Sequence, residues 1–523
     1  MAARTATKLV AQPDVIIIGS GIIGCSIALS LNRRGLRTLN LDKGAGAGSG
    51  STCFSSGIIR TYYTARESAK FAWEGMHYWE GWAEHVGGTL GGGAAGGRSS
   101  SSSSSSRVKE EGWAKEELLQ QQQALLAAAL DDMGGLARYR TCGAVHPRCD
   151  ASNAFLDAVI GHCRALDIPC EEWAVERAAG ALGWDLQGYH PPVRLEHERF
   201  GTPSRPDGVR GAVHFPRTGY VSDPLLACRN LEAACAATGL ATFRYGSSDG
   251  GGLAGGRGGG GGHGEVTAIR KDGSGGRVVG VRTAAGEELR APVVVNAAGP
   301  HSCQITALAF APDVDVNGGD RAVRPNDMRV STRAMRQEVA YVPSPAGVDQ
   351  EADGVVTADF DLGVYWRPEV GGTMLVGGME PACDVAEWVE DPDALDSAAL
   401  SEDWTNIVYR AALRMPGMAI PNSSSGAGIV ALYDVTEDFI PVYDRGALDG
   451  YYMAIGTSGN QFKNAPAAGE LMAEIITQCE GGRDVDADPL QHELKLTGHV
   501  LDASLFSRLR AQDGSLTSGT VVG

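Results

Sequence analysis

The stretch DVIIIGSGIIGCSIALSLNRRGLRTLNLDKG (residues 14–44) constrains the fold more than any other part of the chain. An apolar run over residues 14–18 leads into a glycine-rich turn, and apolar residues then recur at helical spacing over residues 21–34. Gly35 ends the predicted helix, and residues 37–41 predict a second short strand. Two strands joined by a helix form the unit of a parallel sheet. The stretch therefore predicts an α/β fold.

Three glycines in this stretch have the spacing G-x-G-x-x-G, directly after the strand and directly before the helix. Gly19 permits the tight turn, Gly21 lets the backbone approach a pyrophosphate, and Gly24 lets the helix pack closely on the strand. The start of the helix, at Ile22 and Ile23, then presents N–H groups and a positive dipole end to the phosphates. The setting predicts a Rossmann-like dinucleotide site.

Asp42 ends the second predicted strand, where an acidic side chain accepts hydrogen bonds from ribose hydroxyls. An acid at this place favours an unphosphorylated adenosine ribose, and so NAD or FAD over NADP. The glycine pattern does not choose between NAD and FAD.

Length and composition exclude some classes of protein. The 523 residues allow two or three domains, and 43% hydrophobic residues allow a large core. A net charge of −18 without a basic block argues against nucleic acid as a partner. No apolar run approaches the ~20 residues of a membrane span. The first ~13 residues lack the apolar core of a signal peptide, so we expect a cytoplasmic protein, with a mitochondrion or another organelle as the alternative.

The 11 cysteines include three pairs with a seven-residue step: Cys142/Cys149, Cys163/Cys170 and Cys228/Cys235. Zinc sites have tighter spacing and use histidine partners, so we expect free thiols in a reducing compartment and no metal site.

Two low-complexity tracts interrupt the α/β pattern. Residues 87–107 include eight consecutive serines, and 11 of the 18 residues over 247–264 are glycine. Neither tract can bury enough apolar surface to order itself, so both are predicted to be disordered insertions. The following residues 109–130 have a weakly specified helical pattern, and we treat 87–130 as one low-complexity insertion.

Further elements follow from periodicity and flanking residues. We expect a helix over 67–86, strands over 293–295, 336–342 and 451–455, a hairpin of 364–366 with 373–377, and a closing helix that begins near Pro466.

Several separated segments resemble the FAD-dependent D-amino-acid oxidase and sarcosine oxidase superfamily. They follow the family's order over roughly residues 12–480. Besides the glycine pattern they are SSGIIR (55–60), GYVSDPLLACRNLEAACAATG (219–239), NAAGP (296–300), GVYWRP (363–368), YDVTEDFIPVYD (433–444) and GTSGNQFKNAP (456–466).

The resemblance implies an FAD-binding domain assembled from separated segments and a mostly antiparallel β-sheet substrate domain. It places 12–85, 207–306 (with the glycine-rich insertion 247–264) and 426–482 in the FAD-binding domain, 138–206 and 307–425 in the substrate domain, and 483–523 in a C-terminal tail. The implied FAD contacts are Gly19, Gly21, Ile22, Ile23, Gly24, Asp42, Lys43, Ser51, Ser56, Gly57, Ala298, Gly299, Gly456, Gly459, Asn460, Phe462 and Lys463.

The resemblance also implies a carboxylate clamp made of Arg60 and Lys463. A guanidinium binds a carboxylate with two parallel hydrogen bonds, and a lysine adds a point charge. The alternatives are that Arg60 pairs with a protein acid or a flavin phosphate, and that Lys463 acts on the flavin edge. Tyr365 falls where the family has an aromatic wall over the substrate, with ordinary core packing as its alternative.

Departures from the family's pattern carry further expectations. Phe54 and Ala431 stand where relatives attach FAD through His or Cys, so FAD is expected to be non-covalent. Leu375 stands where sarcosine oxidases have a lysine that helps oxygen react, and its absence favours a dehydrogenase with another acceptor. His301 replaces a common Trp and is expected to be a satisfied histidine.

The leading expectation is an FAD-dependent oxidoreductase that oxidises a carboxylate-bearing, sarcosine-like amine or amino acid by hydride transfer to flavin N5. Its electron acceptor is oxygen or another redox protein. Two alternatives are an NAD-dependent dehydrogenase and an assembly or chaperone flavoprotein in which FAD is structural.

Overall fold

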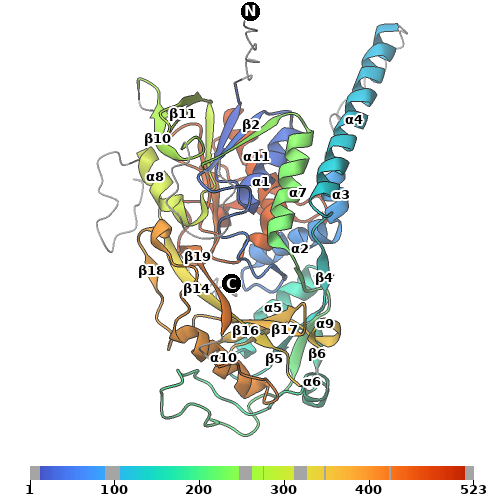
Figure 1. Ribbon diagram of the computed structural model, residues 1–523, viewed down its shortest axis with the longest axis vertical. Coiled ribbons are helices and arrows are strands. Elements are labelled where there is room, and N and C mark those ends of the chain that lie inside the picture. The colour runs from blue at the N-terminus through green and yellow to red at the C-terminus, as the bar shows by residue number, and fades with distance from the viewer. Residues whose placement is uncertain are drawn as a thin grey trace, which may run out of the picture.

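The computed structural model describes residues 12–88, 106–246, 262–274, 276–310, 327–346, 349–422 and 426–512. The chain forms an α/β region, in the upper half of Figure 1, and a region built on an antiparallel sheet, in the lower half. The disorder predicted for the two low-complexity tracts falls largely outside the described residues.

A six-stranded sheet organises the α/β region, in the order β20-β21-β13-β1-β2-β9. Neighbouring strands run parallel except β20, which is antiparallel to β21. The strands are β1 (Val15–Ile18), β2 (Thr38–Asp42), β9 (Ala241–Tyr245), β13 (Val293–Asn296), β20 (Val442–Arg445) and β21 (Tyr451–Ile455).

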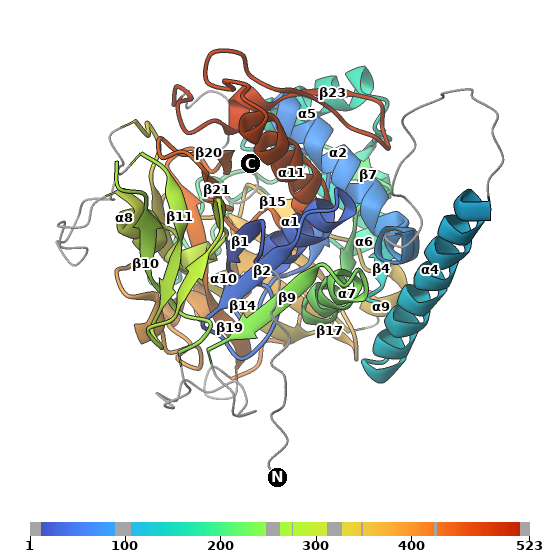
Figure 2. The ribbon, with the colours of Figure 1, turned by 90° about the horizontal axis from the view of Figure 1, so that it is seen from above.

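The alternation of side chains along β1 gives this sheet two covered faces. Val15 and Ile17 pack with the helices α1 (Ile22–Arg33), α7 (Pro224–Ala237) and α11 (Ala465–Glu480). Ile16 and Ile18 pack with α8 (Ser302–Phe310) and with a three-stranded sheet of β10 (Val266–Lys271), β11 (Val278–Thr283) and β12 (Glu288–Arg290). Figure 2 shows these two layers on opposite sides of β1. Burial on both faces explains why β1 is a continuous apolar run.

The second region is built on the sheet β15-β16-β17-β14-β18, with β19 paired to β14. Its strands are β14 (Thr332–Pro343), β15 (Thr357–Asp359), β16 (Val364–Glu369), β17 (Thr373–Gly378), β18 (Trp388–Val389) and β19 (Ala427–Thr436). The helix α10 (Glu402–Arg414) covers one face, where Trp404 and Ile407 pack against Trp366 and Val376. The β16–β17 hairpin confirms the predicted one.

Smaller sheets and helices complete the described chain. One three-stranded sheet has the order β3-β8-β4, with β3 (Ile58–Ile59), β8 (Gly219–Val221) and β4 (Tyr139–Thr141). Another has the order β5-β7-β6, with β5 (Ala144–Pro147), β7 (Ala212–Phe215) and β6 (Glu171–Trp173). The remaining helices include α4 (Ser106–Asp132), α5 (Asn153–Ala165), α6 (Val175–Leu182) and α9 (Gln350–Asp353).

The helix predicted over 67–86 is wrong as one element, whereas the helix over 109–130 is confirmed within α4. The chain forms α2 (Arg66–Glu80) and α3 (Trp82–Gly87), which meet at Gly81. Gly81 has φ −98° and ψ 35°, outside the helical region. Glycine favours such a break because it costs more than other residues to hold in a helix.

The strand β19 shows that residues 426–482 are not confined to the nucleotide-binding region. It pairs with β14 from Thr332↔Thr436 to Tyr341↔Ala427. Its last residues reach the α/β region, because the Asp434 backbone carbonyl accepts from the Ser458 N–H at 2.7 Å. This strand therefore connects the two regions at the edge of the site described below.

The described part of the C-terminal tail packs on the α/β region. Its hairpin of β22 (Gln491–Glu493) and β23 (Val500–Asp502) lies against α2, where the Glu74 carboxylate accepts from the N–H groups of Leu496 and Thr497, both at 2.9 Å. Arg510 donates to Asp438 at 2.8 Å. None of the helices in the described ranges is long and apolar enough to cross a membrane.

Candidate active site

The glycine turn after β1 leaves no room for a side chain at Gly19 or at Gly24. Gly19 has φ +108°, and a Cβ there would lie 2.2 Å from the Ala297 carbonyl oxygen. A Cβ on Gly24 would lie 2.1 Å from the Gly19 carbonyl oxygen. The turn is held in place by the Gly19 N–H, which donates to the Leu41 carbonyl at 2.8 Å. The first and third glycines therefore have the roles that the sequence pattern predicts.

Asp42 at the end of β2 contacts the same turn. One carboxylate oxygen accepts from the Ser20 N–H at 2.6 Å, and the other accepts from the Gly44 N–H at 2.7 Å. A carboxylate has further lone pairs, so these bonds leave capacity for ribose hydroxyls. Thr52, which sequence reasoning missed, accepts from the Ile22 N–H at 3.1 Å through its hydroxyl.

A cavity of about 700 Å³ extends from the glycine turn to the antiparallel sheet. Most of the predicted cofactor contacts line it: Gly19, Gly21, Ile22, Ile23, Asp42, Lys43, Ser51, Ser56, Ala298, Gly299, Gly459 and Phe462. Its wall also includes Tyr365, Phe54 and Ala431, and groups that sequence reasoning did not assign, among them Thr52, Gln304, Tyr433, Asp434 and Gln461.

The other predicted contacts lie behind this wall and shape it. Gly57 and Gly456 have φ values of +65° and +68°. A Cβ on Gly57 would meet the Val221 carbonyl oxygen, and a Cβ on Gly456 would meet the Thr436 methyl group. The Asn460 carbonyl oxygen accepts from the Lys463 ammonium group and from the Tyr63 hydroxyl.

Three charged or titratable side chains join the two regions at the cavity wall. Lys43 follows β2, His301 belongs to the short helix Gly299–His301, and Asp393 belongs to the antiparallel-sheet region. The Lys43 ammonium group lies 2.7 Å from His301 Nε2 and contacts the Asp393 carboxylate, which lies 3.1 Å from His301 Nε2. His301, and secondarily Lys43, holds the pKa of Asp393 below its usual value. His301 is thus a satisfied histidine, as predicted.

We expect Asp393→Asn to speed the release of bound FAD by about 2–5-fold, because an exposed ion pair contributes about 0.2–1 kcal/mol. The variant removes one of the contacts that close the cavity between the two regions. Stopped-flow release into an excess of an apoprotein that binds FAD tightly measures the rate. Asp488→Asn is the matched control. Asp488 forms an ion pair with Arg483 at 2.9 Å, and neither residue lines the cavity. Equal release rates for Asp393→Asn and wild type at low salt would contradict this role.

The two predicted clamp residues meet around one tyrosine ring. The Arg60 guanidinium carbon lies 4.3 Å from the centre of the Tyr63 ring, and the Lys463 ammonium nitrogen lies 5.3 Å from the same centre. Both side chains are buried, at 6% and 3% exposure. Arg60 also donates to the Tyr62 carbonyl at 2.6 Å. Burial, and then the charge of Arg60, holds the pKa of Lys463 well below its usual value.

The aromatic side chains of α2 and α3 fix the segment that carries Lys463. The Trp79 indole N–H donates to the Lys463 carbonyl at 2.7 Å, and the Trp79 ring stacks on Phe462 with centroids 5.0 Å apart. A Cβ on Gly75 would lie 2.6 Å from the Lys463 carbonyl oxygen. Phe462 lines the cavity, so this packing places Lys463 directly behind the cavity wall.

Tyr365, predicted as an aromatic wall, lies on β16 and lines the cavity. Burial raises its pKa to about 12, and its hydroxyl interacts with Tyr433 and Ser56. Tyr433 lies on β19, and Gly459 leaves room for its ring, because a Cβ there would lie 2.3 Å from the Tyr433 ring. The hydroxyls of Tyr365 and Tyr433 are thus neutral donors at the cavity wall.

Two buried titratable groups near the site have no signal in the sequence. Burial raises the pKa of Asp434 to about 7, although its carboxylate accepts from Ser302 and from the Gly456 N–H at 2.6 Å. His146 lies edge-on to Tyr62, with ring centroids 4.4 Å apart, and burial lowers its pKa to about 3. Among the described residues no cluster of His, Cys, Asp and Glu could hold a metal ion.

The residues present fit a dinucleotide cofactor. Gly19 and Gly24 bring the turn close to backbone, an acid ends the second strand, and the cavity continues past the turn to the aromatic wall of the second region. The fold and the site together define a two-domain, dinucleotide-dependent oxidoreductase. The chain belongs to the DAO family, described as "FAD dependent oxidoreductase", whose profile matches residues 14–153 and 169–475. This membership selects FAD over NAD.

Solved structures share the fold over nearly the whole chain. An L-proline dehydrogenase from P. horikoshii has a TM-score of 0.63 at 17% identity, covering 95% of this chain and 97% of its own. A glycine oxidase from Geobacillus kaustophilus has 0.59 at 18% identity, covering 96% and 100%. An L-amino acid deaminase from Proteus vulgaris has 0.55 at 16% identity, covering 96% and 94%. A comparison with curated protein sequences gave no significant match.

Proposed function

We propose that the enzyme oxidises a small amine or amino acid that carries a carboxylate, with non-covalent FAD as the cofactor. The observation that carries the proposal is the pair of buried cations, Arg60 and Lys463, at one tyrosine ring behind the cavity wall. Burying two cations together is costly, and an anion between them offsets that cost. A substrate carboxylate is the anion that this geometry favours.

Three solved structures with this fold support the substrate class, since their names are proline dehydrogenase, glycine oxidase and amino acid deaminase. Their identity to this chain is 16–18%, which supports the class of substrate and not a particular one. Sarcosine, proline and their relatives remain equal candidates within the class.

The roles of the residues follow from their chemistry. Arg60 binds the carboxylate with paired hydrogen bonds, and Lys463 adds a second positive charge beside it. Tyr365 bounds the substrate on the side of the antiparallel sheet. These contacts hold the amine in one orientation and exclude water, which is the main contribution a protein makes to this kind of reaction. When bound, FAD supplies the acceptor for the hydride of the C–H bond next to nitrogen.

An assembly or chaperone flavoprotein with structural FAD is the second candidate. Such a role makes no use of two buried cations behind the cavity wall, so their retention favours catalysis. Reduction of the bound flavin by a small substrate distinguishes the two functions directly.

The test is anaerobic flavin bleaching with sarcosine, dimethylglycine, proline, pipecolate and D-amino acids. Pyrrolidine serves as the matched control for proline, because it keeps the ring amine and lacks the carboxylate. We expect at least one of the carboxylates to bleach the flavin and its decarboxylated analogue to fail. Bleaching by pyrrolidine as fast as by proline would exclude the clamp, and no bleaching by any compound would favour the structural role.

We expect acid denaturation to release all of the FAD from the protein. Phe54 and Ala431, at the two positions where relatives attach the flavin, have no side-chain nucleophile, and both line the cavity. Filtration after denaturation separates released flavin from protein. Yellow colour or flavin fluorescence retained by the precipitated chain would show a covalent link, with Cys53 as the first residue to examine by peptide mapping.

We expect carboxylate binding to take up a proton at pH values between the pKa of Lys463 in the free protein and its higher pKa in the complex. The pKa of Lys463 is lowered in the free protein, and an anion between the two cations raises it again. The affinity for the carboxylate is therefore highest at pH values below the pKa of Lys463 in the free protein. Between that pKa and the higher pKa of Lys463 in the complex, the affinity falls by up to about tenfold per pH unit.

Calorimetric titration with cyclopentanecarboxylate, in two buffers that differ in protonation enthalpy, measures this uptake. Lys463→Met should abolish it. Lys495→Met is the matched control, since Lys495 is 60% exposed and pairs with Glu470. Uptake that persists in Lys463→Met would assign the proton to another group.

A further inference from the structure

A second pocket lies away from the flavin cavity, between α5 and β6. It has a volume of about 420 Å³ and is lined by Ile160, Cys163, Arg164, Asp167, Ile168, Pro169, Cys170 and Glu172. None of these residues lines the flavin cavity. Two of the lining side chains are cysteines, so the pocket brings two thiols together at a place that small molecules can reach from solvent.

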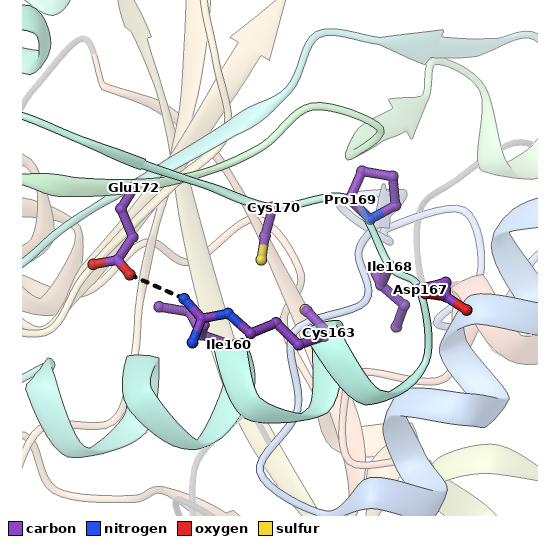
Figure 3. A pocket seen from close by; sticks show the side chains of 8 residues that line it. Ile160, Cys163, Asp167, Ile168, Pro169, Cys170 and Glu172 are labelled. Carbon is purple, nitrogen blue, oxygen red and sulfur yellow. Dashed lines mark hydrogen bonds and ion pairs between the residues drawn. The ribbon is translucent and has the colours of Figure 1, made fainter.

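The turn between α5 and β6 brings Cys163 and Cys170 together. Cys163 lies in the last turn of α5, and the Ile168 N–H donates to the Cys163 carbonyl at 2.9 Å. Asp167 has φ +54°, in the left-handed region, so the chain reverses there. Cys170 then precedes β6, and Figure 3 shows its sulfur pointing toward the helix that carries Cys163.

The two thiols have different environments. Cys163 is buried, whereas Cys170 is partly exposed. A hydrogen bond from the Cys163 thiol, with help from the Arg164 guanidinium, lowers the pKa of Cys170 to about 7, and the same interaction raises the pKa of Cys163. Glu172 opposes this shift and is itself paired with Arg164 at 3.5 Å and Arg148 at 3.4 Å.

Three other partly exposed cysteines lack this activation. Burial raises the pKa of Cys53, Cys142 and Cys479 to about 11. A thiolate, not a thiol, is the nucleophile in cysteine chemistry, so these residues react slowly at neutral pH. Cys170 combines the three features of an oxidation-sensitive cysteine: thiolate character, access from solvent and a second thiol beside it.

We propose that Cys170 is a hydroperoxide-reactive thiol and that Cys163 converts its oxidation product into an intramolecular disulfide. The Cys170 sulfur attacks the terminal oxygen of the hydroperoxide, so an S–O bond forms and the O–O bond breaks. The leaving oxygen takes a proton from solvent and departs as an alcohol, or as water when the oxidant is hydrogen peroxide. Sulfur loses two electrons to the peroxide and becomes a sulfenic acid.

The second step uses the neighbouring thiol. The Cys163 sulfur attacks the sulfenic sulfur, the S–S bond forms, and the S–O bond breaks. The hydroxyl group leaves with the Cys163 proton as water. The pocket is thereby a redox modification site separate from the flavin cavity, and a small dithiol restores it.

The test exposes the FAD-loaded, full-length protein to hydrogen peroxide, followed by alkylation and peptide mapping. We expect Cys170 to react about 100-fold faster than Cys142 at neutral pH, since its larger thiolate fraction outweighs its lower intrinsic nucleophilicity. The reaction rate should reach half of its maximum near pH 7, the pKa to which Cys163 and Arg164 lower Cys170. The product should be a peptide pair linked through Cys163 and Cys170.

Three variants separate the steps. Cys170→Ser should abolish the fast phase, and Cys142→Ser, the matched control, should leave it unchanged. Cys163→Ser should stop the reaction at a sulfenic acid that dimedone traps on Cys170. Oxidation of Cys170 no faster than that of Cys142, or a disulfide from Cys170 to any other cysteine, would overturn the proposal. Bound-flavin absorbance, recorded in each sample, verifies that every variant is folded.

Discussion

Arg60→Ala reduces the rate constant for anaerobic flavin reduction by carboxylate substrates by about 10²–10⁴-fold, because two hydrogen bonds to a charged group contribute about 3–6 kcal/mol together. This expected result follows from the burial of Arg60 beside Lys463 and Tyr63. Most of the loss should appear in kcat/KM, since the clamp binds the substrate and also orients it. Arg60→Lys should recover part of the rate, because it restores the charge without the paired geometry.

The structure offers a matched control for this variant. Arg177 on α6 lies over the Trp173 ring at 3.9 Å, outside the cavity, so Arg177→Ala removes an arginine–aromatic contact with no effect expected on flavin reduction. Thermal denaturation and flavin content of Arg60→Ala identify any loss of folding. Unchanged reduction by every carboxylate substrate, in a folded and flavin-loaded variant, would exclude the clamp.

The nucleotide half of the site could be predicted because its signal is local. Gly19, Gly24 and Asp42 belong to one strand–helix–strand unit, and each residue's role follows from a steric or hydrogen-bonding need that the spacing alone expresses. The burial of β1 on both faces likewise appears in the sequence as an unbroken apolar run. Such features depend on neighbours along the chain, so periodicity and glycine placement reveal them.

The substrate half depends on contacts between distant segments, which periodicity does not express. Only a family resemblance predicted that Arg60 and Lys463 lie close together. The structure adds the Tyr63 ring that both side chains approach and the hydrogen bond from Trp79 to the Lys463 carbonyl. The contact of Lys43 with Asp393 joins two regions of the fold, so neither residue alone signals it.

Single residues in ordinary contexts were also missed for physical reasons. His146 is one histidine on a short strand, and its place beside Tyr62 depends on how β5 packs. The break at Gly81 was missed because the apolar spacing of α2 continues into α3, and a single glycine within a helical pattern is often tolerated.

Gly19→Ala should abolish stable FAD binding. At φ +108° a side chain costs about 1–3 kcal/mol in backbone strain alone. The new Cβ would in addition lie 2.2 Å from the Ala297 carbonyl oxygen, which belongs to backbone leading out of β13 and has no flexible end that could move aside. Relief requires the turn or the end of β13 to shift, and both line the cavity.

We therefore expect the affinity for FAD to fall by about 100-fold or more, the equivalent of roughly 3 kcal/mol. The flavin-to-protein absorbance ratio after gel filtration and fluorescence titration of the apoprotein measure the loss. Gly46→Ala is the matched control, because Gly46 lies in the loop after β2, does not line the cavity and has open space around its Cβ position. If Gly19→Ala and Gly46→Ala retain FAD equally, the close approach of the turn to β13 does not control cofactor binding, and the glycine at this position serves the turn alone.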